Sequence, residues 1–111
     1  MLGAEQERWL YNGLASSRTR WQILANQVMV APYDSLTGSG VRHSMDQWSG
    51  YPAARDRLLN SIAKHAANRT VVITGDIHSN WVNELHSDFG RPDRPVVAVR
   101  RPAVSDMPIQ L

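Results

Sequence analysis

The chain contains no cysteine, which excludes disulfide bonds, thiolate metal ligands and a cysteine nucleophile. It also has no apolar run approaching the roughly 20 residues that a membrane-spanning helix needs. Its first residues lack the basic-then-apolar pattern of an export signal. The sequence therefore predicts no membrane anchor, and any metal that the chain binds must use oxygen and nitrogen ligands.

An excess of one charge sign is lacking as well, because 12 Lys and Arg residues stand against 10 Asp and Glu residues, for a formal net charge of +2. The isoelectric point is about 9.5. The arginines are nevertheless scattered and form no basic stripe, so the chain lacks the electrostatic footprint of a nucleic-acid-binding protein. Its 111 residues, 42% of them hydrophobic, are enough for one small domain and too few for two.

Hydrophobic periodicity predicts two helices. The first runs from Gly3 to about Leu14, with Trp9, Leu10 and Leu14 on its apolar face. The second begins at Pro52, a residue tolerated in a first helical turn, and continues to Asn68.

Four extended segments complete the pattern. Strands are expected over residues 21–30, 70–74 and 95–99, with a further extended piece over 81–85. The stretch 32–50 is rich in turn formers and predicts a long loop with little to pack, a candidate rim for an active site. Strands separated by helices predict an α/β protein with functional residues at the carboxyl ends of its strands.

One such end carries the residues that point most directly to chemistry. The strand over 70–74 leads into Gly75, and Asp76 and His78 follow two positions apart. In extended backbone, residues at this spacing project to the same side, so the carboxylate and the imidazole can reach one cation. The alternative is a turn aspartate that caps the next segment beside a surface histidine.

Four blocks of the sequence, in this order and spacing, resemble the C-terminal half of a PhoD-like alkaline phosphatase. They are residues 2–10 (LGAEQERWL), 21–28 (WQILANQV), 46–55 (DQWSGYPAAR) and 75–78 (GDIH). The resemblance spans roughly residues 1–99. It places the chain among the calcineurin-like metallophosphoesterases and implies an α/β fold, part of a four-layer sandwich in which helices flank mixed sheets. It also implies a two-metal centre of iron and calcium that cleaves phosphate esters, and an exported protein.

The resemblance assigns roles to individual residues. Asp76 and His78 fall on the closing metal-binding motif of the family, and Gln27 falls at about the point where related enzymes carry another metal-binding histidine. A glutamine amide oxygen can ligate a hard cation, but such a residue at a strand end can equally bond the backbone. Asn80 and Trp81 are placed to orient His78 or to wall the site, with core packing as the alternative for Trp81.

Three other residues are candidates for a supporting role at the site. His86 follows an apolar residue and can support the site from behind the ligands. Arg55 and Arg57 begin the second helix near the expected rim, where they can pair with phosphate or form a solvated helix face.

The family supplies most of its metal ligands from an N-terminal half that precedes the segment resembled here. We therefore expect residues 1–99 to be the C-terminal part of a phosphatase domain and the divergent residues 100–111 to be a disordered tail. The leading hypothesis is a metal-dependent phosphoric ester hydrolase, present as a portion that is inactive alone. The alternative is a noncatalytic interaction module that associates with itself or complements a separate N-terminal half.

Overall fold

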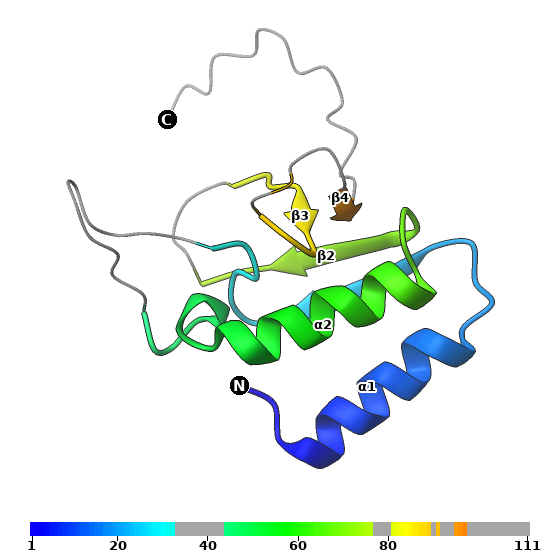
Figure 1. Cartoon of the computed structure of the whole chain (residues 1–111), viewed down its shortest axis with the longest axis horizontal. Helices are drawn as coiled ribbons and strands as arrows, with labels where there is room; N and C mark the ends of the chain where they lie inside the picture. Colours follow the sequence, from blue (N-terminus) through cyan, green and yellow to red (C-terminus); the bar gives the residue numbers. More distant parts are fainter. Residues whose placement is uncertain (33–43, 77–80, 90, 92–94, 98–111) are drawn as a thin grey trace, which may run out of the picture.

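A computed structural model describes residues 1–32, 44–76, 81–89, 91 and 95–97 of the chain. Two α-helices, a short 3-10 helix and four strands follow one another along these residues. They are α1 (Ala4–Ser16), β1 (Gln22–Asn26), η1 (Trp48–Gly50), α2 (Pro52–His65), β2 (Thr70–Thr74), β3 (Leu85–His86) and β4 (Pro95–Val97). In Figure 1, α1 lies beside α2, and α2 runs along the strand pair β1–β2. The expected α/β class is confirmed by this arrangement.

Strands β1 and β2 pair in parallel, in register from Gln22 opposite Thr70 to Asn26 opposite Thr74. A parallel pair needs a crossover connection, and α2 lies on that connection in sequence. The prediction for β2 is confirmed at both ends. Strand β1 is shorter than the predicted 21–30 because the chain bends after Asn26, whose side-chain Nδ2 donates to the Val28 carbonyl oxygen at 2.6 Å.

Strands β3 and β4 form a separate antiparallel pair with a register irregularity between Leu85 and His86. The extended piece predicted over 81–85 is therefore a strand only at its end. The helices differ less from expectation: α1 continues to Ser16, and α2 ends at His65 rather than 68. In the described part of the chain the sheets are two-stranded, and the four-layer sandwich stays a prediction.

The core forms where the inner face of α2 meets the strands and the segment that follows β1. Leu58, Leu59 and Ile62 of α2 are fully buried. The other buried apolar residues are Leu14, Met29, Val30, Ala31, Trp48, Ala54, Ala66 and Leu85. Two expectations were wrong. Trp48 is 2% exposed, so the loop 32–50 does contribute to packing, whereas Trp9 is 73% exposed and does not share the buried position of Leu14.

Arg69 ties together the starts of both parallel strands. Its guanidinium donates to the main-chain oxygens of Thr19 at 2.7 Å, Ser17 at 3.1 Å and His65 at 2.8 Å. Its own carbonyl oxygen accepts a hydrogen bond from the Gln22 N–H at 2.8 Å. One residue thus joins the connection before β1, the end of α2 and the first residue of β1.

Of the helices in the described residues, none combines the length and apolar character that crossing a bilayer requires.

Candidate functional site

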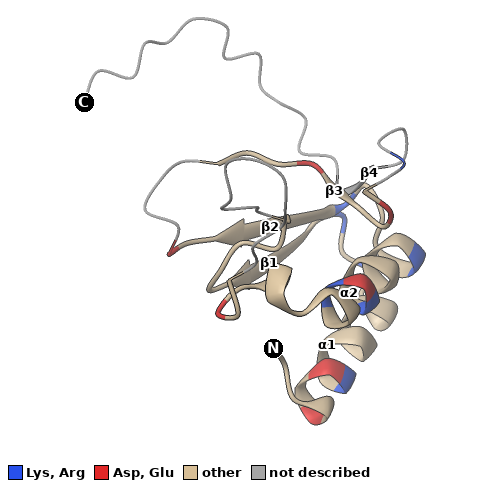
Figure 2. Ribbon diagram, turned by 60° about the vertical axis from the view of Figure 1, so that its left-hand side comes forward, with Lys and Arg blue, Asp and Glu red and all other residues tan. Residues whose placement is uncertain are grey.

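The carboxyl ends of β1 and β2 meet at one edge of the parallel sheet. Immediately beyond them, the Gly75 N–H donates to the Gln27 carbonyl oxygen at 3.2 Å. This hydrogen bond joins the two segments just beyond the strand ends, so Gln27 and Asp76, predicted from separate blocks of sequence, lie at the same edge. Both strands are free of charged residues, as Figure 2 shows, and Asp76 follows β2 after one glycine.

Asp76 has a left-handed backbone conformation, with φ of 60°. Among residues with a side chain, aspartate and asparagine tolerate this conformation best, because their short polar groups can bond locally. The expected extended backbone at Asp76 was therefore wrong, and the chain turns there, as in the alternative of a turn aspartate. Asp76 and Gln27 are both exposed. An accessible carboxylate and an accessible amide are oxygen donors of the kind that hard cations take.

The other predicted site residues have different outcomes. His78 and Asn80 lie outside the described residues. Trp81 is 51% exposed, so the core-packing alternative for this residue was wrong. Within the residues that the structure describes, no three His, Cys, Asp or Glu side chains gather into a metal-binding group. The described part of the site is thus one edge that carries Asp76 and Gln27.

A cluster that the sequence did not predict surrounds Phe89. The His86 ring, in a residue 8% exposed, meets the Phe89 ring edge-on at 5.8 Å between centroids. On the same ring, the Arg55 guanidinium carbon lies 5.3 Å from the centroid. The Arg55 side chain is 12% exposed, so the solvated-face alternative was wrong for this residue. The sequence gives no signal for the contact between Arg55 and Phe89, since these two residues lie far apart along the chain, although His86 is close to Phe89.

Arg57 also has a partner within the chain. Its guanidinium donates to both carboxylate oxygens of Glu7 on α1, at 2.8 and 3.1 Å. This hydrogen bond raises the pKa of Arg57 and lowers that of Glu7. The arrangement assigns Arg57 to helix packing, because the carboxylate already occupies the fork that a phosphate would need.

Comparison with known proteins places the chain in a family. The family model described as PhoD-like phosphatase matches residues 1–105. Alkaline phosphatase D of Bacillus subtilis (strain 168) is 46% identical over 89 residues, which cover 80% of this chain and 15% of that protein. A solved structure described as the structure of PhoD matches with a TM-score of 0.73 and 46% identity, covering 80% of this chain and 17% of that one.

The chain therefore belongs to the PhoD-like phosphatase family. It spans about 15% of the length of the curated relative that it matches.

Proposed function

We propose that this chain contributes part of the metal centre of a phosphoric ester hydrolase. The observation that supports the proposal is the hydrogen bond from the Gly75 N–H to the Gln27 carbonyl oxygen, at 3.2 Å. It places two predicted ligand positions, Gln27 and Asp76, at adjacent ends of parallel strands. Sites of α/β proteins form at this location because the strand ends converge there.

The residues at this edge suit a metal that handles phosphate. Asp76 would hold the ion through its carboxylate, His78 of the family motif would add a nitrogen ligand, and the Gln27 amide oxygen would complete this chain's share. Iron and calcium, the ions implied by the resemblance, both accept oxygen donors, and calcium prefers them. A bound pair of ions would activate water and neutralise the charge of the phosphate ester.

Metal binding tests the proposal without requiring turnover. Calorimetric titration of the metal-free chain with CaCl₂ and with MnCl₂ should show saturable binding, and Asp76→Asn should weaken it at least about tenfold. Asparagine keeps the left-handed turn, so the variant removes mainly the charge. Glu5→Gln, at an exposed carboxylate on α1, is the matched control and should bind as the unaltered chain does. Equal binding by all three proteins would contradict the assigned role of Asp76.

Activity tests the second half of the proposal, that the centre is shared with a segment outside this chain. Two or three ligands leave a hard cation mostly hydrated, so the chain alone should not hydrolyse p-nitrophenyl phosphate with either metal. Addition of Bacillus subtilis alkaline phosphatase D lacking its matched segment should restore metal-dependent hydrolysis, and Asp76→Asn should abolish the recovery. Full turnover by the isolated chain would show that its own residues complete the site.

A further inference from the structure

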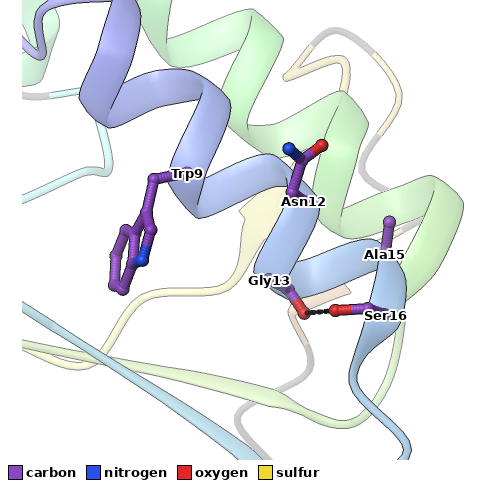
Figure 3. Close-up of a pocket in the computed structure, with 5 residues that line it drawn as sticks. All are labelled: Trp9, Asn12, Gly13, Ala15 and Ser16. Atoms are coloured by element: carbon purple, nitrogen blue, oxygen red, sulfur yellow. Dashed lines mark hydrogen bonds between the residues drawn. The ribbon is translucent and has the colours of Figure 1, made fainter.

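Two features of the described residues outside the site edge differ in the chemistry that they offer. The hollow on α1 drawn in Figure 3 is lined by residues without an ionisable side chain, namely Trp9, Asn12, Gly13, Ala15 and Ser16. The cluster around Phe89 brings a histidine, an arginine and a nearby carboxylate to one partly buried ring. Of the two, the cluster is therefore the one that can respond to a change of pH.

His86 is the titratable group at the centre of this cluster. Its Nε2 atom lies 3.8 Å from the Glu84 Oε2 atom, whereas its Nδ1 atom is buried and meets no hydrogen-bond partner in the described part of the chain. The neutral ring fits this place when its proton is on Nε2, which faces the carboxylate. A second proton would go to Nδ1, where it would create a buried donor without an acceptor.

The positive charge of Arg55 opposes the same protonation. Its guanidinium carbon lies 5.3 Å from the centroid of the Phe89 ring, and the His86 ring meets that ring edge-on at 5.8 Å. Protonation of His86 would therefore bring two cations to one ring in a place where water screens them little. Asp56 relieves this repulsion only in part, because its carboxylate lies 3.9 Å from the Arg55 Nε and its side chain is 54% exposed.

The strands packed around the cluster supply no counter-charge. Strand β4 contacts α2, β2 and β3, and neither β2 nor β4 contains an ionisable residue. On the segment of His86 itself, Glu84 faces the ring and Asp88 follows two positions later. The Glu84 side chain is 56% exposed, so it offsets only part of the cost of a buried charge. Acid should therefore destabilise the cluster.

The cluster fastens one end of the segment that carries the predicted metal ligands, because Asp76 and His78 lie between β2 and β3 in the sequence. Strand β3 is only two residues long and pairs with β4 in an irregular register, so its hydrogen bonds alone hold it weakly. Just before β3, the Asn83 Nδ2 donates to the Met29 sulfur at 3.5 Å, two residues beyond Gln27. Release of β3 would therefore loosen the segment where it passes the end of β1.

We propose that Arg55, Phe89 and His86 form a pH-sensitive latch, in which neutral His86 lets Arg55 hold β3 against α2 and protonated His86 releases it. Arg55 is thereby a positioning residue, which acts on the site through Phe89. The latch keeps the segment between Asp76 and β3 in place at neutral and alkaline pH and frees it in acid. What the latch does to the metal ligands rests on the proposed function, whereas the release of β3 does not.

Nuclear magnetic resonance of the full, metal-free chain tests the latch directly. At about pH 7.5 the Phe89 ring protons should show a nuclear Overhauser effect to the Arg55 Hδ protons, and at about pH 5.5, within the range where histidines ordinarily titrate, this contact should be lost. After correction for intrinsic exchange, the amides of β3 and β4 should exchange at least about tenfold faster at the lower pH, while those of β1 and β2 stay protected. A contact that persists at the lower pH would overturn the proposal.

A matched pair of histidine variants identifies the group that titrates. His86→Gln removes the titrating ring and keeps a side-chain amide, so the contact between Phe89 and Arg55 should persist into acid. His65→Gln, in the last turn of α2 while Arg55 is in the first, is the control and should lose the contact at the same pH as the unaltered chain. Loss of the contact at that pH in His86→Gln would show that His86 is not the switch.

Two further variants separate a charge-driven latch from a merely structural contact. Glu84→Gln removes the carboxylate that partly offsets the charged ring, so β3 should exchange faster still in acid and unchanged at about pH 7.5. Arg55→Gln removes the stack on Phe89, so β3 should exchange fast at both pH values. An equal acceleration by Glu84→Gln at both pH values would contradict the role of charge. If His86→Gln does not fold, Glu84→Gln decides, since its side chain is exposed.

Calorimetry connects the latch to the proposed metal site. Between about pH 7.5 and pH 6, the affinity for MnCl₂ should fall at least about tenfold more in the unaltered chain than in His86→Gln, because both keep the same ligands and only one releases β3. Parallel losses of affinity would overturn the positioning role of Arg55. Absence of metal binding in both chains, with β3 released in acid as described, would contradict the metal proposal and still support the latch.

Discussion

Arg57 on α2 and Glu7 on α1 form a two-pronged hydrogen-bonded ion pair, with nitrogen–oxygen distances of 3.1 and 2.8 Å. The Glu7 side chain is 13% exposed and that of Arg57 is 54% exposed. The planar guanidinium fork matches both carboxylate oxygens, a geometry that lysine cannot reproduce. The pair joins residues 50 positions apart and fixes how the two helices pack.

The Glu7–Arg57 pair predicts a pH dependence of stability. The hydrogen bond from Arg57 lowers the pKa of the Glu7 carboxyl in the folded chain. Its contribution is therefore present above the ordinary glutamate pKa and is lost as pH falls through the lowered value. Glu7→Gln should be less stable than the unaltered chain at pH 7, and the difference should close in acid. Urea unfolding from pH 7 to pH 3 measures it, and a difference that stayed constant would contradict this role.

Two tryptophans should respond in opposite ways to truncation. Trp48 is 2% exposed and Trp9 is 73% exposed. Trp48→Ala should cost about 3–5 kcal/mol, a large share of the stability of a small domain. Trp9→Ala should change the free energy of unfolding by no more than about 0.5 kcal/mol. Denaturant unfolding followed by circular dichroism compares them, and similar losses would show that Trp48 is not a core residue.

Alanine substitutions at two glycines should change the stability in opposite directions. A Cβ on Gly50 would lie 2.6 Å from the Ser44 carbonyl oxygen and 2.9 Å from the Met45 Cα, both backbone atoms. Gly50→Ala should therefore displace η1 and destabilise the chain. Gly13→Ala, in the open interior of α1, should stabilise it by about 0.5–1 kcal/mol because alanine favours the helix. Melting temperatures that moved in the same direction would contradict the close approach at Gly50.

The turn at Asp76 predicts a distinction between two substitutions. Its φ of 60° suits asparagine but strains alanine, which has no side-chain group to bond locally. Asp76→Ala should lose about 1–2 kcal/mol of stability, whereas Asp76→Asn should lose little. Thermal unfolding of both variants in the absence of metal separates the backbone effect from any ligand effect. Equal losses of stability in the two variants would show that Asp76 contributes through its charge and not through its backbone conformation.

Local patterns in the sequence were enough to predict the α/β class and most of the helices and strands of the described residues. The run of β-branched residues at Thr70–Thr74 marked β2 at both ends, and Pro52 marked the start of α2. The end of β1 was not predictable in this way. Apolar residues continue to Val30, and the strand stops because Asn26 bonds the Val28 oxygen, a contact that periodicity does not reveal.

Burial was harder to predict than secondary structure. Trp48 lies among turn formers yet is buried, and Trp9 lies on a predicted apolar face yet is exposed, because each depends on which element packs nearby. The metal-binding roles of Asp76, His78 and Gln27 stay predictions. The strand-end rule predicted the place of the Gly75–Asp76 turn, and the family resemblance drew attention to Gln27, which lies beside that turn. The packing of Arg55 on Phe89 needed the tertiary structure.

Arg69 links the alignment of β1 and β2 at their starts to the positions of the residues at their ends. Parallel strands are joined by a long crossover and not by a tight turn, so a turn cannot set their register. The register depends instead on contacts that hold one strand against the other. Here the anchor lies at the amino-terminal end, where Arg69 binds Ser17, Thr19 and Gln22. A shift of a single residue at that anchor would travel along both strands and separate Gln27 from Asp76 at the far end. Arg69, at the opposite end of the sheet, thereby determines whether Gln27 and Asp76 lie side by side.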